Sequence, residues 1–461
     1  MNLGWKVGAL LRRAPIISSL QELDPGPRRF LLFIVFNVVS WQCLIGPVLV
    51  LFARKIDMPP SWVGFLISFT PISMVLVVAT GLMVMHWGAK RVMFVGWMLR
   101  NLITCIVFTM PWAMQHGGGR MAWYVLMAST LGFCLMRAVG GGGWYPWLHE
   151  VVPEAQRGAY FSCDAGVTQL LNVVVSVAQA LILQGDPGLY RFLVVYGIGI
   201  VSGFLSLALM YRVPGGRGVE GPVSLQRDLA SYRRAIADRP YILFIATASL
   251  CFAAMSWFAA SAVMFMRDAL DVSSWKIMML TAAGSIGIMF TVRHWARFAE
   301  HSGSGPAMAL ALTGHAVTSL LCLTLVPGTW WSVYALGPII VLSSVFGSAF
   351  GMMTPRAMLS YVKASDRVGY TNLWTVGTAI ALGVVPVLVG MVIERGGLWG
   401  FRACFCIAGA SGIACAIALR RVVHDLGAAE HATPPSVWIA HPTRALGMLV
   451  IVTLGLHESN R

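Results

Sequence analysis

Four ionisable side chains lie inside long apolar runs of the sequence: Arg100, Arg137, Asp164 and His315. A charged group within a hydrocarbon layer is costly unless it is paired or faces water, so such residues are candidates for function. Asp164 is the acid nearest to Arg137 in sequence and in depth, and we predict that these two residues pair. The pair would be either a fixed structural ion pair or a proton-sensitive or anion-binding one.

Arg100 and His315 are related by an offset of 215 residues, which places them at equivalent points of two apolar runs. We favour structural roles for both, such as bonding between helices. Arg100 has no obvious acidic partner, so an anionic ligand or lipid remains an alternative. A transport proton would use Asp164, the acid clearly inside an apolar run, with the His315 imidazole as a second candidate.

The same offset of 215 residues relates two short junctions between apolar runs, residues 81–93 and 296–308. His86 corresponds to His301, and Gly88 corresponds to Gly303. A further repeat matches Arg157 with Arg367 after one inserted residue. A chain that repeats its junctions at about half its length is built from two similar halves, an organisation typical of membrane transporters.

The first junction resembles motif A of the major facilitator superfamily, Gly-x-x-x-Asp-Arg-x-Gly-x-(Lys/Arg)-(Lys/Arg). Gly81, Gly88, Lys90 and Arg91 match, whereas Met85 stands at the acid. In the second copy Glu300, His301 and Gly303 take the acid, arginine and glycine positions. The resemblance implies that these residues latch the cytoplasmic gate, with the more complete latch in the second half, and that the loops of Arg157 and Arg367 carry gate contacts.

A second resemblance concerns Arg137, which is followed by the glycines 140–143 as in motif B of the same superfamily. Both motifs imply the superfamily fold: an all-α polytopic membrane protein with two pseudo-symmetric six-helix bundles. The resemblance covers residues 30–420 and is specific for the superfamily rather than for a substrate.

Composition supports a membrane protein independently of the motifs. The chain has 461 residues, of which 57% are hydrophobic and 11% are charged, whereas soluble domains carry roughly 25% charged residues. The net charge of +15 does not indicate nucleic-acid binding, because most of the basic residues fall on the side predicted to hold both termini. The nine cysteines show no metal-ligand spacing, and we expect neither a metal nor a cofactor.

The apolar runs predict twelve membrane-spanning helices, because only a helix satisfies its own backbone polar groups in lipid. We expect them at 30–53, 61–86, 91–112, 121–146, 159–184, 190–212, 241–266, 273–296, 306–327, 331–354, 372–394 and 398–420. The bundles are then residues 30–212 and 241–420, between a cytoplasmic segment 1–29 and a cytoplasmic tail 421–461. The apolar stretch 445–456 of the tail is too short to span and is expected at the membrane interface.

The linker 213–240 contains four apolar residues at helical spacing: Leu225, Leu229, Tyr232 and Ile236. This pattern predicts an amphipathic helix lying on the cytoplasmic membrane surface. A flexible basic loop is the alternative.

In the superfamily the first, fourth, seventh and tenth helices usually line the substrate cavity. The polar and aromatic residues that we nominate for this cavity are Asn37, Trp41, Gln42, Asn172, Trp257 and Asn372. Each could instead serve as a hydrogen-bonding contact between helices. The set suits an amphipathic organic solute better than a highly charged one.

The expected function is therefore a secondary active transporter or facilitator of a small organic solute, with or without proton coupling. We expect a monomer surrounded by lipid in the cell inner membrane, with both termini cytoplasmic, and no enzymatic activity. The alternative is a non-transporting protein of the same fold that assembles a pigment or organelle complex.

Overall fold

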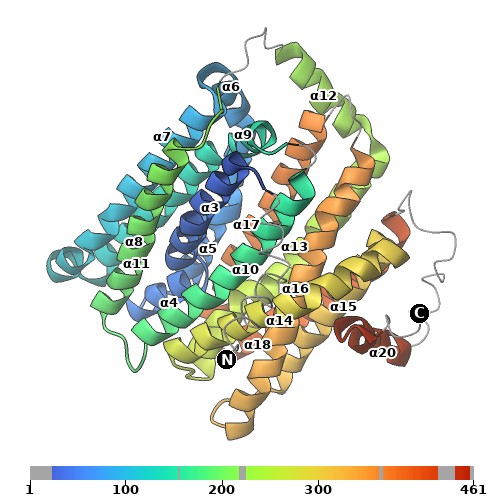
Figure 1. Cartoon of the computed structure of the whole chain (residues 1–461). Helices are drawn as coiled ribbons and strands as arrows, with labels where there is room; N and C mark the ends of the chain where they lie inside the picture. Colours follow the sequence, from blue (N-terminus) through green and yellow to red (C-terminus); the bar gives the residue numbers. More distant parts are fainter. Residues whose placement is uncertain (1–22, 154–155, 218–224, 363–366, 424–441, 457–461) are drawn as a thin grey trace, which may run out of the picture. The chain divides into compact units, whose positions relative to one another are not determined.

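The computed structural model describes residues 23–153, 156–217, 225–362, 367–423 and 442–456 (Figure 1). All regular structure in these residues is helical, which confirms the predicted all-α polytopic fold. Eleven helical stretches are long and apolar enough to cross a membrane. Apolar composition and internally satisfied backbone hydrogen bonds make helices the stable form in lipid.

The stretch Ala89–Gly141 contains 53 residues, far more than one crossing needs. It reverses at Gly118, whose φ of 66° and ψ of −166° are not helical. The arm that begins with α7 (Ala89–Thr104) packs against the arm that ends α8 (Met110–Gly141). This stretch therefore covers the predicted spans 91–112 and 121–146, while the total of twelve spans stays a prediction.

The described chain divides into two compact units. Of the described residues, the first unit holds 23–49 with 76–153 and 156–217. Besides α7 and α8, its helices are α3 (Pro25–Leu44), α6 (Val77–Trp87), α9 (Trp144–Val151), α10 (Arg157–Ile182) and α11 (Leu189–Tyr211). Helix α3 packs against α10 and α11, and α7 packs against α8 and α11.

Of the described residues, the second unit holds 50–75 with 225–362, 367–423 and 442–456. Its main helices are α4 (Pro47–Lys55), α5 (Pro60–Ser73), α12 (Leu225–Ala237), α13 (Arg239–Met264), α14 (Ser274–Ser302), α15 (Ser304–Leu321), α16 (Trp330–Tyr361), α17 (Arg367–Gly396), α18 (Leu398–Val422) and α20 (Pro442–Thr453). Helix α13 packs against α18, and α15 packs against α16 and α18. Each of these pairings has a counterpart in the first unit. The contact of α13 with α18 corresponds to that of α3 with α11, and the contacts of α15 with α16 and α18 correspond to those of α7 with α8 and α11.

Residues 50–75 group with the second unit, although they fall within the first bundle 30–212 expected from chain order. The reason is the close packing of α5 on α17. A Cβ atom at Gly64 would overlap the carbonyl of Pro386, and one at Gly390 would overlap the carbonyl of Pro60. Small residues that allow two backbones to approach this closely are typical of helix contacts in membranes.

The linker forms helix α12, and this helix packs on α17. Its packed residues include Ser231 and Ala235, which are buried, whereas Ile236 is 59% exposed. The Ser231 hydroxyl accepts a hydrogen bond of 3.0 Å from the backbone N–H of Gly369 on α17. Of the predicted apolar face, Tyr232 accepts a hydrogen bond from Asn372 on α17, whereas Ile236 stays exposed.

Helix α20 contains most of the apolar stretch 445–456 and packs on α14 and α15. Its buried residues are Leu449 and Val452, whereas Leu446 and Val450 are at least half exposed. With 12 residues it is too short to cross a bilayer. The predicted segment 1–29 lies mostly outside the described residues.

Candidate functional site

The two repeated junctions have nearly the same backbone geometry. Gly88 joins α6 to α7 with φ 86° and ψ 145°, and Gly303 joins α14 to α15 with φ 88° and ψ 159°. This region of backbone conformation is accessible essentially to glycine alone. The pattern that identified the repeat thus marks two positions where the chain requires glycine for a tight turn between helices.

The first junction is held by Lys90. Its ammonium donates hydrogen bonds to the carbonyls of Tyr211 at 2.9 Å and Val213 at 2.5 Å. Its backbone N–H donates to the carbonyl of Gly216, and the Gly216 N–H donates to the carboxylate of Glu150 at 2.7 Å. Lys90 therefore ties this turn to the end of α11 and the start of the linker.

The second junction holds the residues of the expected latch, Glu300 and His301. Glu300 and His301 are exposed, and Glu300 forms no ion pair with another residue in the described ranges. Arg91 and Gly81 of the first junction are also exposed. The expected latch at Glu300 therefore stays a prediction, and the side chains of Arg157 and Arg367 lie outside what the structure describes.

An arginine cluster lies in the first unit where α3, α7 and α8 meet. We define it as Asn37 and Trp41 on α3, Arg100 and Asn101 on α7, and Arg137 on α8. Arg100 is 1% exposed. Its Nη1 donates to Asn37 Oδ1 at 3.1 Å, and its Nε donates to Asn101 Oδ1 at 3.3 Å. The bond to Asn37 joins α7 to α3, while the role of Arg100, structural or ligand-binding, stays a prediction.

Aromatic rings surround the guanidinium of Arg100. Its central carbon lies 4.8 Å from the ring centroid of Trp97 and 5.0 Å from that of Phe133. The faces of aromatic rings attract cations, most strongly when both are desolvated. The rings thus supply part of the stabilisation that water would otherwise give to this buried charge.

The structure does not contain the predicted pair of Arg137 and Asp164. The Arg137 guanidinium lies instead over the indole of Trp41, with its central carbon 4.0 Å from the ring centroid. Among the described residues the ion pair that forms is elsewhere, between Arg54 and Asp268. Proximity in sequence and depth suggested Asp164, but the neighbouring face of α3 presents an aromatic ring, which needs no desolvation of a carboxylate.

Two further nominated cavity residues contact each other. Gln42 on α3 donates through Nε2 to Asn172 Oδ1 on α10 at 2.7 Å. Gln179 donates to the backbone carbonyl of Gln42 at 2.8 Å. These bonds extend a polar strip along α3 beyond the arginine cluster, and they also bind α3 to α10.

The nominated residues of the second unit are dispersed. Asn372 donates to the Tyr232 hydroxyl of α12, so it anchors the linker helix. Trp257 lies on α13, and its carbonyl accepts a bond from the Ser261 hydroxyl. Asn372 therefore has a structural contact that its sequence position did not reveal.

His315 occupies the place in the second unit that Arg100 occupies in the first. It is 6% exposed. Its Nδ1 lies 3.1 Å from the hydroxyl of Ser343 on α16, and its ring packs edge-on against Phe258 on α13 at 5.2 Å. Arg100 and His315 are thus both buried and both contact a neighbouring helix, while their functional roles stay predictions.

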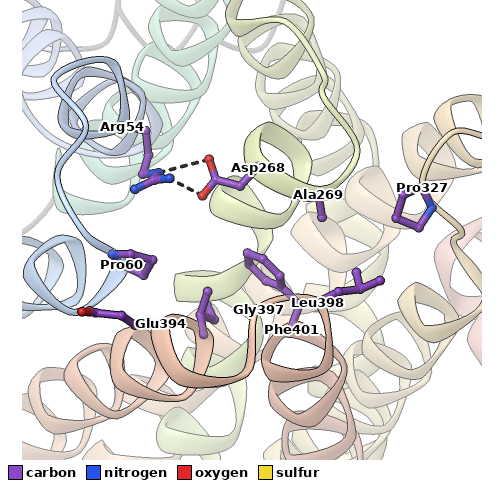
Figure 2. A pocket seen from close by; sticks show the side chains of 10 residues that line it. Arg54, Pro60, Asp268, Ala269, Pro327, Glu394, Gly397, Leu398 and Phe401 are labelled. Carbon is purple, nitrogen blue, oxygen red and sulfur yellow. Dashed lines mark hydrogen bonds and ion pairs between the residues drawn. The ribbon is translucent and has the colours of Figure 1, made fainter.

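A pocket of about 360 Å³ opens within the second unit beside the ends of α4, α13 and α17 (Figure 2). The Arg54 Nε lies 2.9 Å from a carboxylate oxygen of Asp268. The Glu394 carboxylate accepts a bond of 3.1 Å from the backbone N–H of Ser61 at the start of α5. The dashed lines of Figure 2 mark the bonds between Arg54 and Asp268.

Sequence reasoning missed this polar group. One feature of the sequence could have predicted the pair. Arg54 and Asp268 have opposite charges, are 214 residues apart, and each follows the first apolar run of its half of the chain. No group of three or more metal-ligating side chains occurs among the residues that the structure describes.

Comparisons with known proteins identify the architecture. No protein-family model and no curated protein sequence matches the chain. Solved structures do match. An inward-facing bacterial homologue of the iron transporter ferroportin has a TM-score of 0.68 and 14% identity, covering 87% of this chain and 98% of that one.

Two other solved structures are similar to the same extent. A variant of the nucleoside transporter NupG has a TM-score of 0.66 and 11% identity, covering 86% of this chain and 100% of that one. A D-xylose–proton symporter has a TM-score of 0.63 and 14% identity, covering 86% of this chain and 96% of that one. At such low identity these matches establish the fold.

Proposed function

Because the chain has the major facilitator fold, we propose that it is a secondary transporter that moves a small organic solute by alternating access. The observation that carries the proposal is the doubled glycine turn: Gly88 and Gly303 adopt matching geometries at equivalent junctions of two similarly packed units. Two equivalent units around a midplane site are the basis of alternating access. The similar solved structures are themselves named as transporters of nucleosides, iron and xylose.

The proposed site lies in the first unit, in the arginine cluster and the neighbouring polar strip of Gln42 and Asn172. In the proposed orientation both termini are cytoplasmic and the membrane is the cell inner membrane. The glycine turns then face the cytoplasm, and the pocket of Arg54 and Asp268 opens on the opposite side. The assembly-factor alternative is not favoured, since no feature of the described residues points to a protein partner.

Asp164 is the proposed group for proton coupling. It is half-buried on α10 and forms no ion pair with another described residue. An intramembrane carboxylate that is not paired is suited to bind and release a proton. Substitution of Asp164 by Asn should remove the response of uptake to a pH gradient while solute exchange persists.

The test of transport uses purified protein in liposomes, incubated with a mixture of small metabolites. Solutes retained inside are identified by mass spectrometry against empty liposomes. We expect at least one solute to accumulate in wild type and much less in Gly303→Trp liposomes, with equal amounts of inserted protein. If no solute enters above the empty-liposome level, or if Gly303→Trp transports as well as wild type, the proposal fails.

A further inference from the structure

The arginine cluster contains buried hydrogen-bond donors that no group of the described chain satisfies. The Nη2 atom of Arg100 and the Nδ2 atom of Asn101 are both fully buried and have no partner. The Arg137 guanidinium forms no hydrogen bond with a described residue, and its central carbon lies 4.0 Å from the ring centroid of Trp41. Leaving a buried donor without an acceptor is destabilising, and more so for a charged group.

The cluster also has an excess of positive charge. The rings that contact the two guanidinium groups, Phe133 at Arg100 and Trp41 at Arg137, have centroids 5.9 Å apart. No carboxylate among the described residues pairs with either group. Two unpaired guanidinium groups in one helical bundle are expensive to bury. Such a cost is tolerated at a site where an incoming ligand supplies both the missing negative charge and the missing acceptors.

The surroundings of the two cations favour a particular kind of anion. Guanidinium groups bind planar carboxylates in a bidentate manner. The adjoining surfaces are aromatic: Trp41 lies under Arg137 and is 5.9 Å from Phe133. Asn37, Trp41 and Arg137 are only partly buried, whereas Arg100 lies fully buried behind Asn37.

We propose that the arginine cluster is the binding site for the carboxylate of an amphipathic organic anion, whose apolar part packs against Trp41. Arg137 makes the first contact, and Arg100 with Asn101 supplies the buried donors. This inference rests on the proposed transport function and names its substrate class. The equivalent place in the second unit holds His315, whose Nδ1 is already engaged by Ser343, so recognition of the charge belongs to the first unit.

The first experiment compares two probes of the same shape with purified wild-type protein in detergent. Radiolabelled phenylacetate carries a carboxylate, and phenylacetamide is its neutral counterpart. We expect saturable binding of phenylacetate. Unlabelled phenylacetate should displace the label at least about 10-fold more effectively than phenylacetamide does, because hydrogen bonds to a charged carboxylate are stronger than those to a neutral amide. Equal displacement by both probes, or no saturable binding, overturns the proposal without the need for a variant.

The second experiment assigns the binding to the cluster. Arg100→Gln and Arg137→Gln should each weaken phenylacetate binding about 10-fold or more. The matched control is Arg402→Gln, because Arg402 also lies over an indole, that of Trp399 at 4.8 Å, but in the second unit. The control should bind phenylacetate as wild type does. Unchanged binding in both cluster variants, or an equal loss in the control, contradicts the assignment.

A lipid phosphate is the other source of a negative charge in a membrane. The binding assay is therefore repeated with added phosphatidylglycerol. We expect the radiolabelled phenylacetate to remain bound. If phosphatidylglycerol displaces the label and unlabelled phenylacetate does not, the assignment to a soluble carboxylate is overturned. Binding and transport are measured separately, so the two proposals can fail independently. An anion that binds but never enters liposomes refutes the proposed transport function alone. Uptake of neutral solutes without preference for carboxylates refutes the assignment of the substrate class alone.

Discussion

Two glycine residues set the geometry of the junctions that the sequence repeats. Gly88 and Gly303 have φ values of 86° and 88°, in a region that other residues rarely adopt. Both are buried between the helices that they connect. At each position the requirement is for a backbone conformation that glycine adopts without strain.

We predict that Gly88→Ala and Gly303→Ala each destabilise the protein by about 1–3 kcal/mol, because alanine must occupy a strained backbone conformation. Gly81→Ala is the control: a Cβ atom there meets no atom within 4 Å, and its φ is not positive. Thermal unfolding in detergent should show a lower Tm for the first two variants only. A Tm equal to that of wild type in both would refute the backbone argument.

The ion pair of Arg54 and Asp268 is also a feature of single residues. Their side chains are 22% and 20% exposed, so water screens their attraction. A double-mutant cycle with Arg54→Gln and Asp268→Asn should give a coupling free energy of about 0.2–1 kcal/mol that decreases with added salt. A coupling that is unchanged by salt would mean that the two residues interact through packing rather than charge.

At the scale of elements, contacts with α17 hold the linker helix α12 in place. The Gly369 N–H bonds to the Ser231 hydroxyl, and a Cβ atom at Gly369 would lie 2.5 Å from the Ser231 carbonyl carbon. Tyr370 adds a bond of 2.6 Å from its hydroxyl to the Asp238 carboxylate. Helix α12 is therefore fixed to α17 through backbone contact as well as side chains.

Substitution of Gly369 by Ala should push α12 away from α17, because the contact is with backbone that cannot rotate aside. Limited trypsin digestion should then cut the arginine-rich linker several times faster than in wild type. Gly351→Ala, at an open position of α16, should leave the rate of cleavage unchanged. Equal cleavage of the Gly369 variant and wild type would show that the contact can be relieved locally.

At the scale of the whole molecule, the packing units do not follow chain order. Residues 50–75 are encoded before the linker but pack in the second unit. If the chain is cut at the linker, fragments 1–222 and 223–461 expressed together should still be recovered as one complex. The reason is that α5 from the first fragment completes the packing surface of α17.

The fragment experiment has a specific variant. Gly64→Leu would overlap the backbone of Pro386 on α17, and we expect it to reduce recovery of the complex severalfold. Gly81→Leu in the same fragment faces open space and should have no effect. Full recovery with the Gly64 variant would show that contacts other than α5 hold the fragments together.

The sequence by itself determined the membrane class, the helical architecture and the internal repeat. Hydropathy fixes where helices must form, because lipid cannot satisfy a bare backbone. A constant offset also placed Arg100 and His315 at equivalent positions of the two halves, and in the structure both side chains are buried and contact a neighbouring helix.

Only the tertiary structure decided which side chains meet. It placed Arg137 on Trp41 instead of beside Asp164, joined Arg54 to Asp268, and grouped residues 50–75 with the second unit. These outcomes depend on the rotation of each helix about its axis and on close contacts between backbones. Neither is recorded in the periodicity of an all-apolar helix, since such a helix presents similar side chains on every face.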